Sequence, residues 1–171
     1  MKIQEGYMPF KGHSTYYRIV GECKNNKKPL ILLHGGPGSS HNYFEILDDL
    51  AVLDDRAIIM YDQFGCGLSE VYNESELFNQ DTWIEELIAL RKHLGLDEVH
   101  LLGQSWGGMM EIIYAIDYQP KGVKSITLSS TLSSASLYAS EQHRMIKELP
   151  KRNKTQSIKP NKTMTLHLVN V

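Results

Sequence analysis

The motif Gly103-Gln104-Ser105-Trp106-Gly107 is the feature of this chain that most constrains its fold. An apolar run precedes it, and a segment with helical spacing of apolar residues follows it. Gly-x-Ser-x-Gly in that setting is typical of a strained strand-to-helix turn, in which small residues let the strand and the helix approach while the serine hydroxyl projects. The sequence therefore predicts such a turn, with Ser105 as a candidate nucleophile.

A second glycine-rich segment, His34-Gly35-Gly36-Pro37-Gly38, follows the apolar run from Leu30 to Leu33. Acyl transfer places negative charge on the substrate oxygen and needs two hydrogen-bond donors aimed at it. We expect one donor to be the backbone N–H of Trp106. The other is expected from this loop, because its glycines let the backbone come close to the substrate.

His34 belongs to the same loop, and we expect it to brace the glycines, with Pro37 and Gly38 also supporting the loop. The alternative is that His34 is the catalytic base. The usual order of residues in sites of this kind, with the histidine after the nucleophile, disfavours it.

Patterning along the chain predicts a sheet that is mostly parallel, with helices on both faces. Residues 2–20 alternate apolar and polar side chains around Lys11-Gly12, which predicts an antiparallel hairpin at the edge of the sheet. Buried strands are expected at 30–33 and 57–61 and further strands at 99–102 and 123–128, with helices at 40–53, 82–94, 105–119 and 141–149. Strands and helices that alternate through short connections indicate an α/β fold.

Three helix details follow from local patterns. Thr82-Trp83-Ile84-Glu85 has the form of a capping box and predicts the start of the helix at 82–94. One apolar stripe of this helix is formed by Trp83, Leu87, Leu90 and Leu94. Apolar stripes are expected to face the core in the other two helices, over Tyr43, Ile46, Leu47 and Leu50 in the first, and over Met109, Ile112, Ile113 and Ile116 in the second.

Composition indicates an ordinary globular protein, because 42% of the 171 residues are hydrophobic and 22% are charged. We expect no signal peptide and no membrane span, and hence a cytoplasmic protein or one loosely associated with the cell envelope. Cys23 and Cys66 lack the spacing of a zinc site or a disulfide framework, so free, mostly buried thiols and no metal or other cofactor are expected.

The net charge of −2 argues against nucleic acid as a partner, but the charge is unevenly distributed. Five of the 18 basic residues and none of the 20 acidic residues lie in 151–171, so the first 150 residues carry −7 and the remainder +5. The composition therefore changes near Pro150. The sequence leaves the oligomeric state open.

Together with the two glycine-rich motifs, Tyr61-Asp62-Gln63 followed by Gly65-Cys66-Gly67 resembles the proline iminopeptidases (prolyl aminopeptidases). These serine peptidases of the α/β-hydrolase fold release an N-terminal proline from peptides. The resemblance extends over about residues 1–150, and it is to the enzymes of lactic acid bacteria and their relatives. It implies an acyl-enzyme on Ser105, oxyanion-hole amides from Gly36 and Trp106, and peptides with an N-terminal proline as substrates.

The resemblance also implies a domain organisation. Residues 1–132 correspond to the N-terminal part of the hydrolase core, and residues 133–150 to the start of a helical cap. The basic tail at 151–171 does not look like family sequence. We therefore expect a truncated copy, in which the later strands and most of the cap are missing and a changed reading frame near codon 150 produces the tail.

The acid and the histidine of the catalytic triad are expected to be absent from this chain. In this fold they follow the nucleophile, each in a loop after a later strand. The histidines after Ser105 are His143, on an expected cap helix, and His167, in the tail. Asp117 is expected to be a surface carboxylate, and Asp62 a structural turn residue, because it precedes the nucleophile.

Two other functions remain open at this point. One is an esterase or another acyl hydrolase of the same fold, since Ser105 and the oxyanion loop specify acyl chemistry but not the leaving group. The other is a remnant without turnover, in which residues 123–128 form an exposed hydrophobic sheet edge that favours aggregation.

Overall fold

The structure is a computed structural model that describes residues 1–71 and 75–149. The chain forms two units, Met1–Thr131 and a second that begins at Leu132, and each is described separately here. The expected aberrant tail at 151–171 lies outside the described residues.

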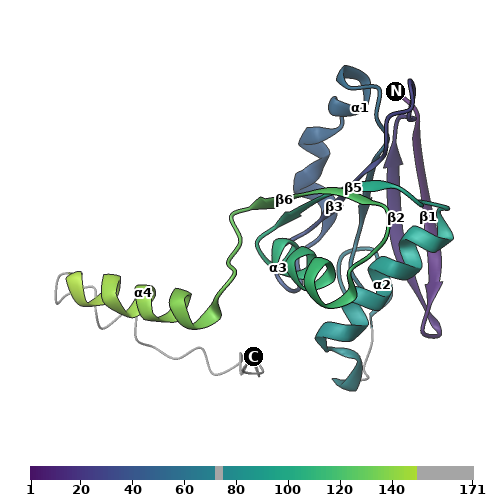
Figure 1. The fold of residues 1–171 in the computed structure, drawn as a ribbon. Helices are drawn as coiled ribbons and strands as arrows, with labels where there is room; N and C mark the ends of the chain where they lie inside the picture. Colours follow the sequence, from purple (N-terminus) through teal and green to yellow (C-terminus); the bar gives the residue numbers. More distant parts are fainter. Residues whose placement is uncertain (72–74, 150–171) are drawn as a thin grey trace. The chain divides into compact units, whose positions relative to one another are not determined.

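The first unit is built on one six-stranded sheet (Figure 1), with strand order β1-β2-β4-β3-β5-β6. The pairs β1·β2 and β2·β4 are antiparallel, whereas β4·β3, β3·β5 and β5·β6 are parallel. This confirms the predicted hairpin and the mostly parallel sheet. The strands are β1 (Ile3–Phe10), β2 (His13–Val20), β3 (Leu30–Leu33), β4 (Ile58–Tyr61), β5 (Val99–Gln104) and β6 (Val123–Ser129).

Helices cover both faces of this sheet, with α1 on one side and α2 and α3 on the other (Figure 1). The helical elements of the first unit are η1 (His41–Leu47, a 3₁₀ helix), α1 (Leu50–Leu53), η2 (Ser75–Leu77, a 3₁₀ helix), α2 (Gln80–His93), α3 (Trp106–Ile113) and η3 (Tyr114–Tyr118, a π-helical turn).

Alternation along the central strands divides the core into two clusters. In β3, Ile31 and Leu33 face the cluster formed with α2 and α3, whereas Leu32 faces the cluster formed with η1 and α1. In β4, Tyr61 and Met60 divide in the same way. Because both faces of these strands are buried, they read as continuous apolar runs, as expected for parallel strands covered on both sides.

The predicted helix at 40–53 is wrong as a single α-helix. The segment instead forms η1 and the short α1. In a 3₁₀ helix side chains repeat every three residues, and the side chains that pack inward are His41, Phe44 and Leu47. The predicted stripe is therefore confirmed for Leu47 and Leu50, which pack against the core, and wrong for Tyr43 and Ile46, which are 43% and 84% exposed.

The predicted start of α2 is also wrong, although its buried stripe of Trp83, Leu87 and Leu90 is confirmed. The helix begins at Gln80 and its N-cap is Asn79, whose side chain accepts the Thr82 N–H at 2.9 Å. Asparagine is among the best N-cap residues. The Thr82 side chain is therefore inside the helix, where it is buried.

The apolar face predicted for α3 is only partly correct. Met109 and Ile113 are partly buried against the core, whereas Ile116 is 64% exposed. The fully buried residues include Gly107, Met110, Glu111 and Tyr114, which recur at helical spacing. The face of α3 that contains Gly107 packs against β3, because only a residue without a side chain fits beside the Leu33 carbonyl. The change to a π-turn after Ile113 then shifts the position of the following residues.

At the edge of the first unit, β6 pairs with β5 alone among the described strands. Its side chains Ile126 and Leu128 are 38% and 46% exposed.

The expectation that both thiols are buried is wrong for Cys23, which is exposed, and confirmed for Cys66.

In the second unit, α4 (Ala135–Glu148) begins six residues before the predicted Glu141. Ser134 caps it by accepting the Leu137 N–H at 3.2 Å. Serine is a good N-cap residue, so the serine-rich segment begins this helix instead of extending the loop. Across both units, none of the described helices combines the length and the apolar character needed to cross a membrane.

Candidate active site

Ser105 occupies the sharp turn between β5 and α3, with φ 53° and ψ −112°. A non-glycine residue is rarely found at positive φ, and such strain persists only where the surroundings hold it. The Ser105 N–H donates to the Ser129 carbonyl at 2.8 Å, and its own carbonyl accepts the Thr131 hydroxyl at 2.7 Å. Backbone contacts from β6 and the segment after it therefore fix the turn.

The two glycines of the motif allow the strand and the helix to cross at close range. A Cβ atom on Gly107 would overlap the Leu33 carbonyl of β3, and one on Gly103 would overlap the Gly107 backbone. Any larger residue would push α3 away from the sheet. The sequence requirement for glycine at both positions is therefore steric.

The Ser105 hydroxyl makes no hydrogen bond to any of residues 1–71 and 75–149, and the residue is half-buried. The Trp106 N–H, at the first position of α3, likewise has no partner among these residues. Unpaired N–H groups and the positive end of the helix dipole at a helix N-terminus favour negative charge. The turn therefore places an unpaired hydroxyl beside an unpaired N–H donor.

The glycine-rich loop after β3 lies directly against this turn. A Cβ atom on Gly35 would be 3.2 Å from the Ser105 Cβ. Gly36 has φ 130°, a conformation that glycine adopts readily, and the Gly36-Pro37 peptide bond is cis. In the described part of the chain the Gly36 N–H has no hydrogen-bond partner. The structure thus brings the two predicted donor segments and Ser105 together.

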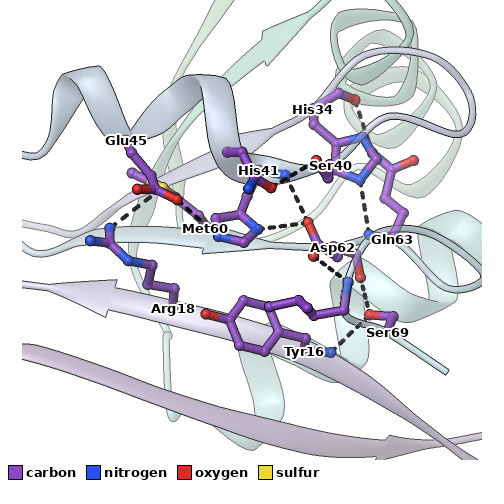
Figure 2. A network of polar contacts seen from close by, with 12 residues as sticks. Tyr16, Arg18, His34, Ser40, His41, Glu45, Met60, Asp62, Gln63 and Ser69 are labelled. Carbon is purple, nitrogen blue, oxygen red and sulfur yellow. Dashed lines mark hydrogen bonds and ion pairs between the residues drawn. The ribbon is translucent and has the colours of Figure 1, made fainter.

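His34 is fully buried behind this loop, and both of its ring nitrogens are engaged (Figure 2). Nδ1–H donates to the Gly35 carbonyl at 2.8 Å, and Nε2 accepts the Gln63 N–H at 3.0 Å. Burial lowers the pKa of His34, outweighing the Gly35 carbonyl, which raises it. A neutral ring with both nitrogens occupied has no free position from which to take a proton from Ser105.

Asp62 joins the start of η1, which follows the glycine-rich loop, to the loop after β4 (Figure 2). Its Oδ1 accepts the His41 N–H and ring Nδ1–H at 2.7 and 2.8 Å, and its Oδ2 accepts the Leu68 N–H at 2.8 Å. Burial raises the pKa of this carboxyl, but the hydrogen bonds outweigh it and the pKa lies below its ordinary value. Asp62 is therefore an ionised structural residue of the turn, as expected.

Sequence patterns missed two buried acids, one in α3 and one in α2. Glu111 in α3 is fully buried, and neither carboxylate oxygen forms a hydrogen bond of good geometry with a described residue. Burial raises its pKa to about 8 and outweighs the nearby Gly103 N–H, which lowers it. Glu86 in α2 accepts from the Thr15 hydroxyl and the Phe64 N–H, and burial also raises its pKa to about 8. The available signal was a glutamate at helical spacing from apolar residues of a buried face.

Glu111 also lines a cavity of about 180 Å³ with mostly apolar neighbours, which include Leu101, Val123 and Ile126. This cavity lies under the sheet edge formed by β6. Over the residues that the structure describes, no group of three or more histidine, cysteine, aspartate and glutamate side chains is placed to hold a metal ion.

A base for Ser105 is not assembled within the described residues. His143 is exposed on α4, and its Nδ1 donates to the Ala139 carbonyl at 2.7 Å. Asp117 is exposed in η3, as expected. His167 lies outside the described residues.

Comparisons with known proteins agree with this geometry. The family model for the alpha/beta hydrolase fold matches residues 28–171. The chain is 71% identical over 146 residues to a proline iminopeptidase of Clostridioides difficile strain 630, covering 85% of this chain and 50% of that protein. It is 64% identical over 151 residues to a proline iminopeptidase of Lactobacillus helveticus, covering 88% and 51%. The predicted resemblance is confirmed.

A solved structure gives the same picture. The crystal structure of a proline iminopeptidase from Mycobacterium smegmatis superimposes with a TM-score of 0.82 at 30% identity, covering 90% of this chain and 55% of that one. The chain thus spans about half the length of the curated relatives that it matches. The strand order, the glycine-rich turns and the matched family model together show that this chain belongs to the α/β-hydrolase fold family.

Proposed function

We propose that this chain carries the nucleophile and the oxyanion hole of a proline-iminopeptidase-type serine hydrolase. Ser105 is the nucleophile, and the backbone N–H groups of Gly36 and Trp106 form the oxyanion hole. The observation that carries the proposal is the position of Ser105, at positive φ before α3 with the glycine-rich loop against it. Each oxyanion donor of this kind is worth about 3 kcal/mol of transition-state stabilisation.

In the proposed reaction the Ser105 oxygen attacks the carbonyl carbon of the N-terminal residue, and its proton passes to a base in solution, since no base is assembled among the described residues. The negative charge that develops on the carbonyl oxygen is held by the two amides, and the peptide amine leaves with a proton. His34 supports this loop rather than acting as the base, since both of its ring nitrogens are engaged. Gly35, Pro37 and Gly38 shape the same loop.

We further propose that the acid and the histidine of the triad belong to the half of the relatives that this chain does not span. The relatives are about twice the aligned length, and the described residues bring no histidine to Ser105. On this proposal residues 1–132 are the N-terminal part of the core, 133–150 start a cap, and 151–171 arise from a changed reading frame. Translating the encoding DNA in its other two frames after codon 150 tests the last point.

The proposed substrates are peptides with an N-terminal proline, because the similar proteins are proline iminopeptidases. An activated L-prolyl ester tests acylation without requiring turnover. Intact-mass measurement is expected to detect one prolyl group on Ser105, and none in a Ser105→Ala variant. A clear preference for an acetyl ester would favour the esterase alternative, and no adduct from either ester would favour a remnant without catalysis.

A further inference from the structure

Tyr43, in η1, connects the two halves of the proposed oxyanion hole. Its hydroxyl oxygen accepts the Gly35 N–H at 2.7 Å and its hydroxyl proton is donated to the Gln104 Oε1 at 3.1 Å. Gly35 belongs to the glycine-rich loop, and Gln104 is the residue immediately before Ser105. One side chain therefore ties the loop to the turn that carries the nucleophile.

The contact determines which amide of the loop remains available. Because the Gly35 N–H is used by Tyr43, the neighbouring Gly36 N–H is the one left without a partner among the described residues. The loop also packs tightly here, since a Cβ atom on Gly35 would overlap Gln104 Oε1. The Tyr43 hydroxyl and the lack of a side chain on Gly35 therefore both support the contact between the glycine-rich loop and Gln104.

We propose that Tyr43 is a positioning residue that holds the Gly36 amide at its place relative to Ser105 through Gln104. The inference rests on the proposed function and names a residue outside the nucleophile and the two oxyanion donors. Catalytic donors act through geometry that is fixed before the reaction, so a small displacement of one amide weakens the stabilisation of the transition state.

The hydroxyl keeps its proton at neutral pH. Burial raises the pKa of Tyr43 and outweighs the Gly35 N–H, which lowers it. Both hydrogen bonds therefore persist across the physiological range. The Tyr43 ring packs on the Phe44 ring with centroids 4.5 Å apart, and the side chain is 43% exposed. A Tyr43→Phe variant keeps this ring contact and removes only the hydroxyl, so it is expected to fold.

The test compares the rate at which a fluorophosphonate labels Ser105 in the full chain and in Tyr43→Phe. We expect the rate constant to fall about tenfold, less than the loss of a whole oxyanion donor, because the Gly36 amide is displaced rather than removed. Tyr7→Phe is the matched control, since Tyr7 is exposed and its hydroxyl has no hydrogen bond within the described residues. An equal rate in the two phenylalanine variants, at similar unfolding midpoints, overturns the proposal.

A double-mutant cycle separates the bridge from the loss of an isolated hydroxyl. Gln104→Leu removes the acceptor, and Gln104→Glu retains an acceptor oxygen. We expect Gln104→Glu to label faster than Gln104→Leu, and the double variant Tyr43→Phe/Gln104→Leu to label no more slowly than the slower single variant. Fully additive losses would show that the two side chains act independently and would overturn the bridge.

Hydrogen exchange at the Gly35 amide tests the same contact without any reactivity at Ser105. We expect this amide to be protected in the full chain and in Tyr7→Phe, and to exchange at least tenfold faster in Tyr43→Phe. Unchanged protection in Tyr43→Phe overturns the positioning role. If the unaltered chain fails to label while the Gly35 exchange behaves as expected, the contact stands, and it is the proposed acyl chemistry that fails.

Discussion

The Asp62 carboxylate binds His41 twice through one oxygen, accepting the backbone N–H at 2.7 Å and the ring Nδ1–H at 2.8 Å. Its second oxygen accepts the Leu68 N–H, and a Cβ atom on Gly67 would overlap the carboxylate. Asp62 is fully buried. Since His41 opens the helical segment that follows the glycine-rich loop, this single carboxylate fixes two loops at the carboxyl ends of the parallel strands.

Replacing Asp62 with asparagine is expected to lower the free energy of unfolding by about 3 kcal/mol, because a buried charged acceptor with three donors is lost. An asparagine amide also presents N–H groups toward one of these donors. Urea unfolding measures the change. Asp117→Asn is the control, since Asp117 is exposed and a surface change of this kind costs about 0.5 kcal/mol or less. Similar effects of the two substitutions would contradict the structural role of Asp62.

Glu111 predicts a pH dependence of stability. Its pKa is raised to about 8 in the folded state, so the folded protein retains a proton that the unfolded chain releases near its ordinary pKa of about 4.3. The stabilisation is therefore complete below about pH 4.3 and is lost as the pH rises toward 8. In Glu111→Gln, the fall in unfolding free energy between pH 5 and pH 8 should be shallower by about 1.4 kcal/mol per pH unit.

Denaturant unfolding at several pH values measures that slope, and part of it should remain in Glu111→Gln because Glu86 has a similarly raised pKa. Glu76→Gln is the control, since Glu76 is exposed and its side chain forms no ion pair with a described residue. Parallel curves for the unaltered chain and Glu111→Gln would show that Glu111 titrates normally.

The contact of α3 with the sheet predicts a steric effect at Gly107. Gly107→Ala is expected to destabilise the protein by about 3 kcal/mol or more, because the added methyl group would overlap the Leu33 carbonyl. Gly12→Ala provides a contrast. Its added Cβ meets nothing within 4 Å, but its φ of 86° costs about 1 kcal/mol for alanine. Thermal unfolding ranks the two, and the reverse order would argue against the close crossing.

The N-cap of α2 gives another test. Asn79→Ala should cost about 1 kcal/mol, because the Thr82 N–H loses its acceptor at the helix N-terminus. Glu85→Gln, which changes only an exposed pair with Lys11, should change the unfolding free energy by less than about 1 kcal/mol. If Glu85→Gln proved the more damaging of the two in chemical unfolding, the capping box predicted from the sequence would be the better description.

The central strands β3 and β4 were predictable because they are buried on both faces and bounded by turn residues. Leu30 to Leu33 is one such apolar run, and β3 coincides with it. The helical faces were less predictable, because tertiary contacts choose them. In η1 the side chains repeat every three residues, so Phe44 is buried and Ile46 is exposed. In α3 the close packing of Gly107 turns Glu111 into the core. Neither effect is visible in a pattern that assumes 3.6 residues per turn.

The site shows the same division. Ser105, Gly36 and Trp106 were identified as candidates because motif spacing determines local backbone geometry, and the structure packs the glycine-rich loop against the turn that carries Ser105. The Tyr43 bridge was not predictable, since its partners Gly35 and Gln104 are distant in sequence and meet only when β3 and β5 pair.

The most direct measurement for the central claim is the reaction of the full chain with a fluorophosphonate, with the modified residue located by peptide mass spectrometry. Our account predicts that one equivalent reacts with Ser105, that Ser105→Ala is not labelled, and that unfolding in denaturant before the reaction abolishes labelling. Folded protein that stays unlabelled, or that is modified at another serine instead, would contradict it.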